Sequence, residues 1–127
     1  MPNMKTLIKT LTALFLLIAI CLLCSCGKVN FAKKYASIAG ESWCTIASDG
    51  SYMKIDTNPY DIKNSQNQAA NSQIKVVLQD LGFSGSIYEE MKNTSALMGR
   101  QSASTDKYSV SWTYHPDRGL EVLFSKQ

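Results

Sequence analysis

The chain contains few residues whose types and spacing could support metal chemistry. His115 is the single histidine, and it lies in a proline-containing turn without the HExxH spacing of a zinc protease. Asp56, Asn58 and Asp61 could offer oxygen atoms to calcium. The spacing of an EF-hand loop would, however, put the next ligand at Tyr60, and the glycine that such a loop needs is absent. We therefore expect neither a metal site nor a cofactor.

Nucleophilic and acid–base catalysis have little support either. The Gly-Phe-Ser-Gly stretch at 82–85 lacks the spacing of a nucleophile elbow and falls between two predicted helices rather than after a strand. Glu89 and Glu90 are adjacent on a predicted helix, so their carboxylates point in different directions. Cys44 falls on the core face of a predicted hairpin, where a small packed side chain is a better interpretation than a nucleophile. We interpret the chain as non-enzymatic.

The N-terminal residues follow the order of a secretory signal peptide. Two lysines precede an apolar run at 11–24, and the small Ser25 then precedes Cys26. As a helix, this run of about 14 residues reaches about 21 Å, less than the roughly 30 Å hydrocarbon core of a bilayer. Extending the run back to Leu7 lengthens it to about 18 residues, so a transmembrane helix stays an alternative.

Leu23-Cys24-Ser25-Cys26 resembles the lipobox of bacterial lipoproteins, with a branched aliphatic residue at −3 and a small residue at −1. The residues before the neighbouring cysteines are large, so Cys26 alone fits. The resemblance implies that residues 1–25 are removed and that Cys26 carries a diacylglyceryl thioether, whose two acyl chains anchor a protein stably. It also implies attachment to the cell membrane or outer membrane, facing outside the cytoplasm. The alternative is an ordinary secreted protein with a free Cys26.

Cleavage before Cys26 would leave about 102 residues, enough for one domain with a modest core. Loss of Lys5 and Lys9 would lower the formal net charge from +3 to about +1. The remaining lysines are scattered and form no basic stripe, which argues against nucleic acid as a partner. Since Cys26 would be lipidated, Cys44 would have no disulfide partner. The sequence leaves the oligomeric state open.

Two further segments are expected after the signal peptide. Residues 26–40 would form the lipidated N-terminus and a tether with a short helix, because apolar residues between Val29 and Ile38 loosely follow one helical face and Gly40 would end it. Residues 41–127 would form a single domain.

That domain should open with a hairpin over 43–56. Asp49-Gly50 is typical of a tight type I′ turn with positive φ at both residues. With that turn, Cys44 faces Ile55 on an aliphatic face of the hairpin, and Ile46 faces Met53 on the same side.

Two helices should follow. The first is expected over 65–81, ended by Gly82, and its start could shift by several residues; its apolar positions are Ala70, Ile74, Val77, Leu78 and Leu81. Ser86 and Glu89 have the spacing of a capping box and predict a second helix to about residue 98. Its inward side chains would be Ile87, Met91, Thr94 and Met98. Residues 100–106 are interpreted as a polar surface loop.

A second hairpin ends the chain. Large apolar residues alternate with serine and threonine from Tyr108 onward. A five-residue loop at 115–119 puts nearly all of them on one face, pairing Tyr114 with Leu120, Trp112 with Val122 and Val110 with Phe124. The predicted fold is therefore α+β, a four-stranded antiparallel sheet of two hairpins with two helices packed on one face. The strand order stays open.

Ile46-Ala47-Ser48-Asp49-Gly50-Ser51-Tyr52 and residues 112–117 resemble stretches of small exported bacterial proteins to which no activity is attached, so the resemblance implies none here. We expect a membrane-anchored binding module with a protein partner in the cell envelope. One alternative is an inhibitor or immunity-type lipoprotein directed at a secreted enzyme. A small hydrolase that uses His115 or Cys44 is another.

Trp43 and Tyr52 are the candidate binding residues. In the predicted hairpin both lie on the face turned away from the helices, where exposed aromatic rings suit recognition. The alternative is that Trp43 packs beneath the short helix, around Phe31 and Tyr35.

Overall fold

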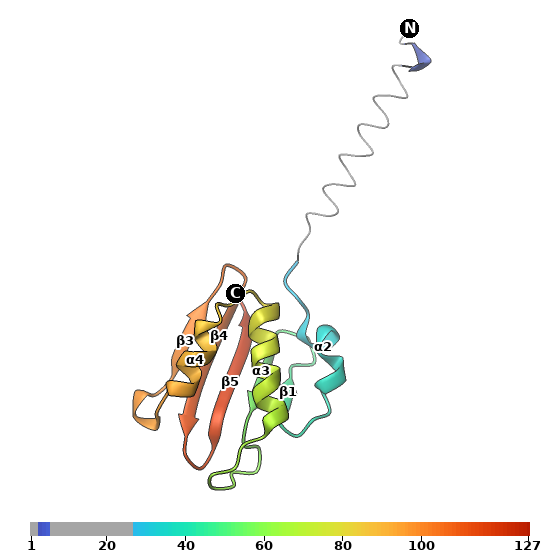
Figure 1. Cartoon of the computed structure of the whole chain (residues 1–127). Coiled ribbons are helices and arrows are strands. Elements are labelled where there is room, and N and C mark those ends of the chain that lie inside the picture. Colours follow the sequence, from blue (N-terminus) through green and yellow to red (C-terminus); the bar gives the residue numbers. More distant parts are fainter. Residues whose placement is uncertain (1–2, 6–26) are drawn as a thin grey trace.

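The computed structural model describes residues 3–5 and 27–127 (Figure 1). The predicted signal peptide and the predicted lipid attachment site Cys26 lie outside this part of the chain, apart from residues 3–5. From the N-terminus, the elements are α2 Phe31–Lys34, η1 Ala36–Ile38, β1 Cys44–Ile46, β2 Tyr52–Asp56, α3 Gln68–Asp80, α4 Ser86–Asn93, η2 Ala96–Met98, β3 Gln101–Ser104, β4 Tyr108–His115 and β5 Gly119–Lys126.

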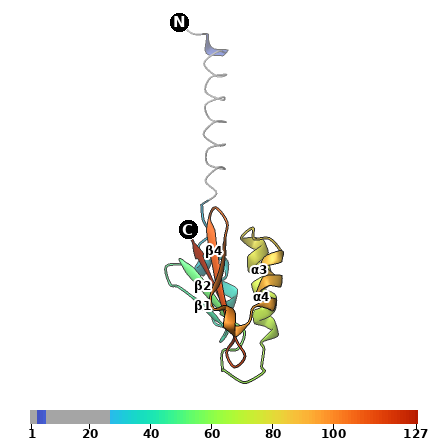
Figure 2. The same cartoon turned by 90° about the vertical axis from the view of Figure 1, so that its left-hand side faces the viewer.

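The fold is α+β, built on an antiparallel sheet with the strand order β1-β2-β5-β4-β3. The four-stranded prediction was wrong because residues 101–104, interpreted as loop, form the fifth strand at one edge. Gln101 and Ala103 are half-buried while Ser102 and Ser104 are exposed, which is the alternation of a strand with one face toward the core. Helices α3 and α4 lie together on one face of the sheet, as expected (Figure 2).

Both predicted registers are confirmed. Cys44 pairs with Ile55 in the first hairpin, and Trp112 pairs with Val122 in the last. Pairing continues to His115 and Gly119, so the last connection is shorter than the five-residue loop, with the same register. Strand β2 pairs with β5, which settles the order that the sequence left open and places β5 in the middle of the sheet.

The first turn differs from the type I′ prediction. Gly50 has φ of 71°, whereas Asp49 does not have a positive φ. The Asp49 carboxylate instead accepts hydrogen bonds from the Ser51 N–H (3.0 Å) and hydroxyl (2.6 Å), and the Gly50 N–H donates to the Ala47 carbonyl (2.9 Å). A side chain at position 50 would collide with that of Asn30, so the glycine also allows the N-terminal segment to approach.

The two main helices start differently from the sequence prediction. Helix α3 starts at Gln68 rather than residue 65, because the Asn67 side chain caps it by accepting from the Ala70 N–H (3.0 Å). The predicted capping box of Ser86 and Glu89 is wrong, since Gly85 is the N-cap and no side chain caps α4.

Helix α4 ends at Asn93, five residues before the predicted end. Thr94 has left the helix, and its hydroxyl donates to the Glu90 carbonyl (2.8 Å) and accepts from the buried Trp112 indole N–H (2.8 Å). Met98 therefore lies in η2 and is 51% exposed instead of facing inward. Met91 and Thr94 are buried as predicted, and Ile87 is half-buried.

The core lies between the sheet and the helices and includes part of the predicted tether. Phe31 and Tyr35 are buried in it, and the Tyr35 hydroxyl donates to the Asp80 carboxylate at the end of α3 (3.1 Å). The Val29 N–H donates to the Tyr108 hydroxyl (2.7 Å). The segment assigned to the tether at 26–40 is thus packed into the domain from about Val29 onward.

Candidate binding groove

The structure does not bring the two predicted binding residues together as an exposed patch. Trp43 is 6% exposed and belongs to the same buried cluster as Phe31 and Tyr35, which is the alternative considered for it. Tyr52 is 41% exposed on the sheet. The binding role of an exposed Trp43 is therefore withdrawn, because its ring is covered.

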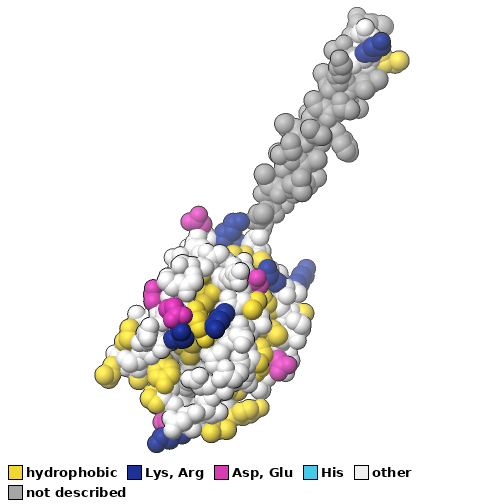
Figure 3. All heavy atoms as spheres, in the orientation of Figure 1, with side chains coloured by type: hydrophobic (Ala, Val, Ile, Leu, Met, Phe, Trp, Pro, Cys, Tyr) yellow, Lys and Arg dark blue, Asp and Glu magenta, His cyan; other side chains and the backbone are white. Residues whose placement is uncertain are grey.

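A groove between α3 and α4 combines apolar, aromatic, amide and charged side chains. It consists of two adjoining hollows of about 500 Å³ and 360 Å³ that share Lys75 from α3 and Tyr88 from α4. Figure 3 shows this face of the molecule, with apolar side chains visible inside the hollow and lysine or arginine side chains beside it. We call these two hollows the α3–α4 groove.

The groove lies between α3 and α4, and its lining combines side chains that border the core, such as Leu78 and Met91, with more exposed ones. Ile74, Val77 and Leu78 bury one side of α3, so Lys75 is left at the surface. On α4, Met91 points to the core and Tyr88, one turn earlier, is half-buried at the groove. The helical period thus fixes which side chains line the groove.

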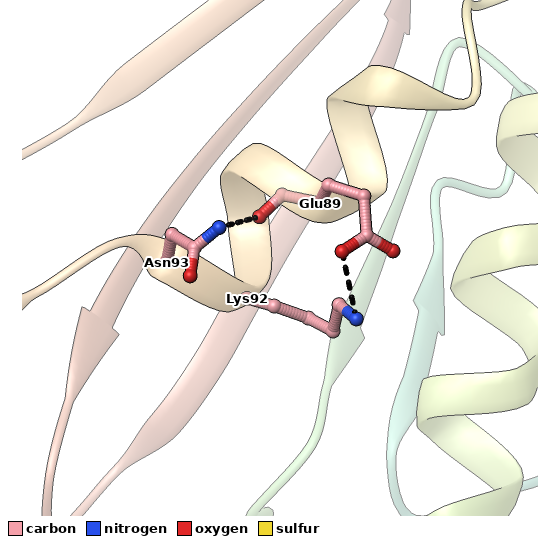
Figure 4. Close-up of polar contacts among 3 residues, drawn as sticks. All are labelled: Glu89, Lys92 and Asn93. Atoms are coloured by element: carbon pink, nitrogen blue, oxygen red, sulfur yellow. Dashed lines mark hydrogen bonds and ion pairs between the residues drawn. The ribbon is translucent and has the colours of Figure 1, made fainter.

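Two ammonium groups lie close to one aromatic ring. Lys75 Nζ is 4.7 Å and Lys92 Nζ is 5.7 Å from the centroid of the Tyr88 ring, within the range of cation–π attraction. Lys92 Nζ also pairs with Glu89 Oε2 at 2.8 Å (Figure 4). The hydrogen bond that the Lys92 ammonium donates to the Glu89 carboxylate raises the pKa of Lys92, so Lys92 is charged at neutral pH.

The two ends of the groove differ in character. Leu78 and Phe83 give an apolar lining at the end near the α3–α4 connection. The other end carries the polar side chains of Gln66, Gln68, Asn71 and Ser72 together with Met91, Tyr114 and Leu120. Lys75 and Tyr88 line both hollows and therefore mark the junction. The groove can accept an apolar group at one end, a negative charge in the middle and hydrogen-bonding groups at the other end.

The sequence analysis missed this groove. The spacing of Tyr88 and Lys92 by four residues puts them on one side of a helix and was visible in the sequence. Lys75 comes from another helix, and its approach to Tyr88 depends on how α3 and α4 pack on the sheet.

Cys44 and His115 are the two residues that the hydrolase alternative would use. Cys44 is a buried free thiol, and burial, with a smaller contribution from Glu41, raises its pKa to about 11. Such a thiol stays protonated at neutral pH and is a poor nucleophile. His115 is half-buried, and its Nδ1 accepts from the Asp117 N–H (3.1 Å), within the turn.

Residues 3–5 and 27–127 contain no group of three or more histidine, cysteine or acidic side chains that could hold a metal ion. Within the same ranges, no helix has the length and apolar character needed to cross a membrane. Comparisons with protein-family models, with curated proteins and with solved structures find no match to the chain.

Proposed function

We propose that the chain is a lipid-anchored, non-enzymatic binding module on the outer side of a bacterial membrane, and that the α3–α4 groove receives a protein partner in the cell envelope. The lipobox-like residues 23–26 support the anchor. The groove supports the binding role.

The observation that carries the proposal is the composition of the groove. A half-buried aromatic ring with two lysines, an apolar end and an amide-containing end offers several kinds of contact in one groove. Sites that bind other proteins combine aromatic anchors with a polar rim in this way. The groove is also open to the outside on the face that Figure 3 shows.

Site-specific photocrosslinking on intact cells tests this proposal. A photoreactive residue replaces Gln79, an exposed residue that lines the groove, in the full-length chain. The matched control carries the same residue in place of Thr45, which is exposed on the other face of the sheet. We expect a discrete crosslinked product of higher mass from position 79 and none from position 45. Absence of a product at position 79, or the same product from both positions, would contradict the proposal.

A further inference from the structure

We propose that the α3–α4 groove recognises an acidic segment of its partner, with a carboxylate held between Lys75 and Lys92 and a neighbouring apolar side chain placed against Leu78 and Phe83. This inference rests on the proposed binding function and names the chemistry of the ligand. It follows from three features of the groove.

The first feature is charge. Of the described residues that line the two hollows, Lys75 and Lys92 are cationic and Glu89 alone is acidic. Both ammonium groups lie within 6 Å of the centroid of the Tyr88 ring, and both lysines line the same hollow of about 360 Å³. Glu89 offsets the charge of Lys92 through their 2.8 Å contact, whereas Lys75 has no carboxylate partner among residues 3–5 and 27–127. A carboxylate from outside that contacts both lysines would be attracted by Lys75 and would compete with Glu89 for Lys92.

The second feature is exposure, which shows that charge alone would bind weakly. Lys92 and Glu89 have 50% and 63% of their side chains exposed, and water and salt screen an ion pair in such a setting, so it contributes little to binding. A free carboxylate would therefore not be retained. Useful affinity requires additional apolar contact, since removing apolar surface from water is favourable in proportion to the area buried.

The third feature is the arrangement along the groove. The apolar end with Leu78 and Phe83 lies on one side of the lysine pair, and the amide-containing end lies on the other. A peptide that contains an acidic residue next to an apolar residue presents a carboxylate, an apolar side chain and backbone amides, which are the groups that these parts of the groove can contact. Hydrogen bonds between its backbone and Gln68 or Asn71 would fix its position, as side-chain amides both donate and accept.

Titration of the isotope-labelled full-length chain in detergent micelles, followed by NMR, tests the ligand class. The probe is a ten-residue glycine/serine peptide that carries two glutamates and two leucines. Its matched controls replace the glutamates by glutamines or the leucines by serines, and free glutamate is a fourth ligand. We expect the probe to shift the signals of Lys75, Tyr88 and Lys92, and each control to bind several-fold more weakly. Equal binding of the glutamine peptide or of free glutamate would overturn the proposal.

Three variants of the chain give a second test with effects of opposite sign. Lys75→Gln and Lys92→Gln should each weaken binding of the probe by about two- to fivefold, as expected for one exposed ion pair. Glu89→Gln should strengthen binding, because it frees Lys92 from its internal partner. Lys33→Gln changes an exposed lysine on α2 that does not line the groove and should have no effect.

Weaker binding by Glu89→Gln, or equal effects of the two groove lysines and Lys33, would show that the lysines do not hold a carboxylate. If the yield of the groove-specific crosslink in cells were unchanged by Lys75→Gln and Lys92→Gln combined, the acidic ligand would be excluded while the binding function stood.

Discussion

At the scale of single residues, hydrogen bonds pair the polar side-chain atoms that are buried in the described part of the chain. All buried side-chain nitrogen and oxygen atoms in the described part of the chain have a partner. The Trp112 indole illustrates this, because its N–H would be unpaired in the core without the Thr94 hydroxyl. That pairing requires Thr94 to leave the helical path, which is why α4 ends where it does.

Cys44 should be inert in the folded protein. It is 6% exposed, and its pKa is raised from the ordinary value near 9 to about 11, so little thiolate is present at neutral pH. Mass-spectrometric peptide mapping after a brief pulse of a polar thiol reagent, applied to the chain in membranes, measures this. A Cys44→Ala/Thr45→Cys variant, with the thiol at the exposed neighbouring position, is the control and should be labelled fast.

The same pKa shift has a consequence for stability. A raised pKa in the folded state means that the contribution of Cys44 is fully present below about pH 9 and is lost as pH rises toward about 11. The Cys44→Ala variant should lack this part of the alkaline destabilisation.

In the labelling experiment, labelling of Cys44 at neutral pH as fast as that of the cysteine at position 45 would contradict both its burial and its inertness.

The burial of Cys44 was predictable and the groove was not, for a physical reason. In a strand the side chains alternate, so parity alone assigns Cys44 to the face of Ile55 once a turn is located. The pairing of Lys75 with Tyr88 depends on the packing of two helices, and no local periodicity encodes it. Trp43 shows that this alternation alone does not determine burial. Alternation along the hairpin places its side chain on the face turned away from the helices, whereas the structure buries it in the core.

At the scale of elements, prediction succeeded where apolar periodicity was strong. Helix α3 and strands β4 and β5 carry long apolar patterns and were found at nearly the right positions. Strand β3 was missed because Gln-Ser-Ala-Ser contains neither β-branched nor aromatic residues. Its place in the sheet comes from pairing with β4 along four residues rather than from its own preference.

A buried polar cluster joins two connections of the chain. The Asn58 side-chain amide donates to the carbonyls of Ile62 and Asp117 at 2.9 Å each and accepts from the Ile62 N–H at 3.2 Å. Thr57 lies beside it, where its hydroxyl accepts from the Leu120 N–H at 2.8 Å. The cluster ties the β2–α3 connection to the β4–β5 turn.

Asn58→Ala should lower the free energy of unfolding by about 2–4 kcal/mol, because it removes three hydrogen bonds and leaves backbone groups without partners at a buried site. Asn93→Ala is the control, since Asn93 is exposed and donates one hydrogen bond to the Glu89 carbonyl (3.0 Å). Its effect should stay below about 0.5 kcal/mol. Thermal unfolding of both full-length variants in the same detergent gives the comparison, and equal melting temperatures would refute the role of the cluster.

At the scale of the whole molecule, the domain has a helix layer on one face of the sheet (Figure 2), and the α3–α4 groove opens on the outer side of that layer, away from the sheet (Figure 3). The described chain resumes at Gly27 at the same end of the domain as the C-terminus (Figure 1). A lipid on the preceding residue would put the membrane at that end. The groove, on a lateral surface, would then stay accessible to a partner in the envelope.

The anchor itself is testable at Cys26. Leu23 and Ser25 stand at −3 and −1 before it, so processing should remove residues 1–25 and leave a diacylglyceryl thioether at the new N-terminus. Cys26→Ser removes the thiol that carries the lipid, and the protein should then be released from the membrane or accumulate unprocessed.

Intact-mass measurement of the membrane fraction distinguishes these outcomes. Cys24→Ser is the control: it changes the neighbouring cysteine but keeps Leu23, Ser25 and Cys26, and it should be lipidated like the unaltered chain. Two acyl chains make membrane attachment stable where one gives only reversible binding, so the lipidated form should resist extraction by salt. An unmodified Cys26 in the membrane fraction, or a chain that still carries residues 1–25, would exclude the lipid anchor and leave the alternative of a transmembrane helix formed by the apolar run.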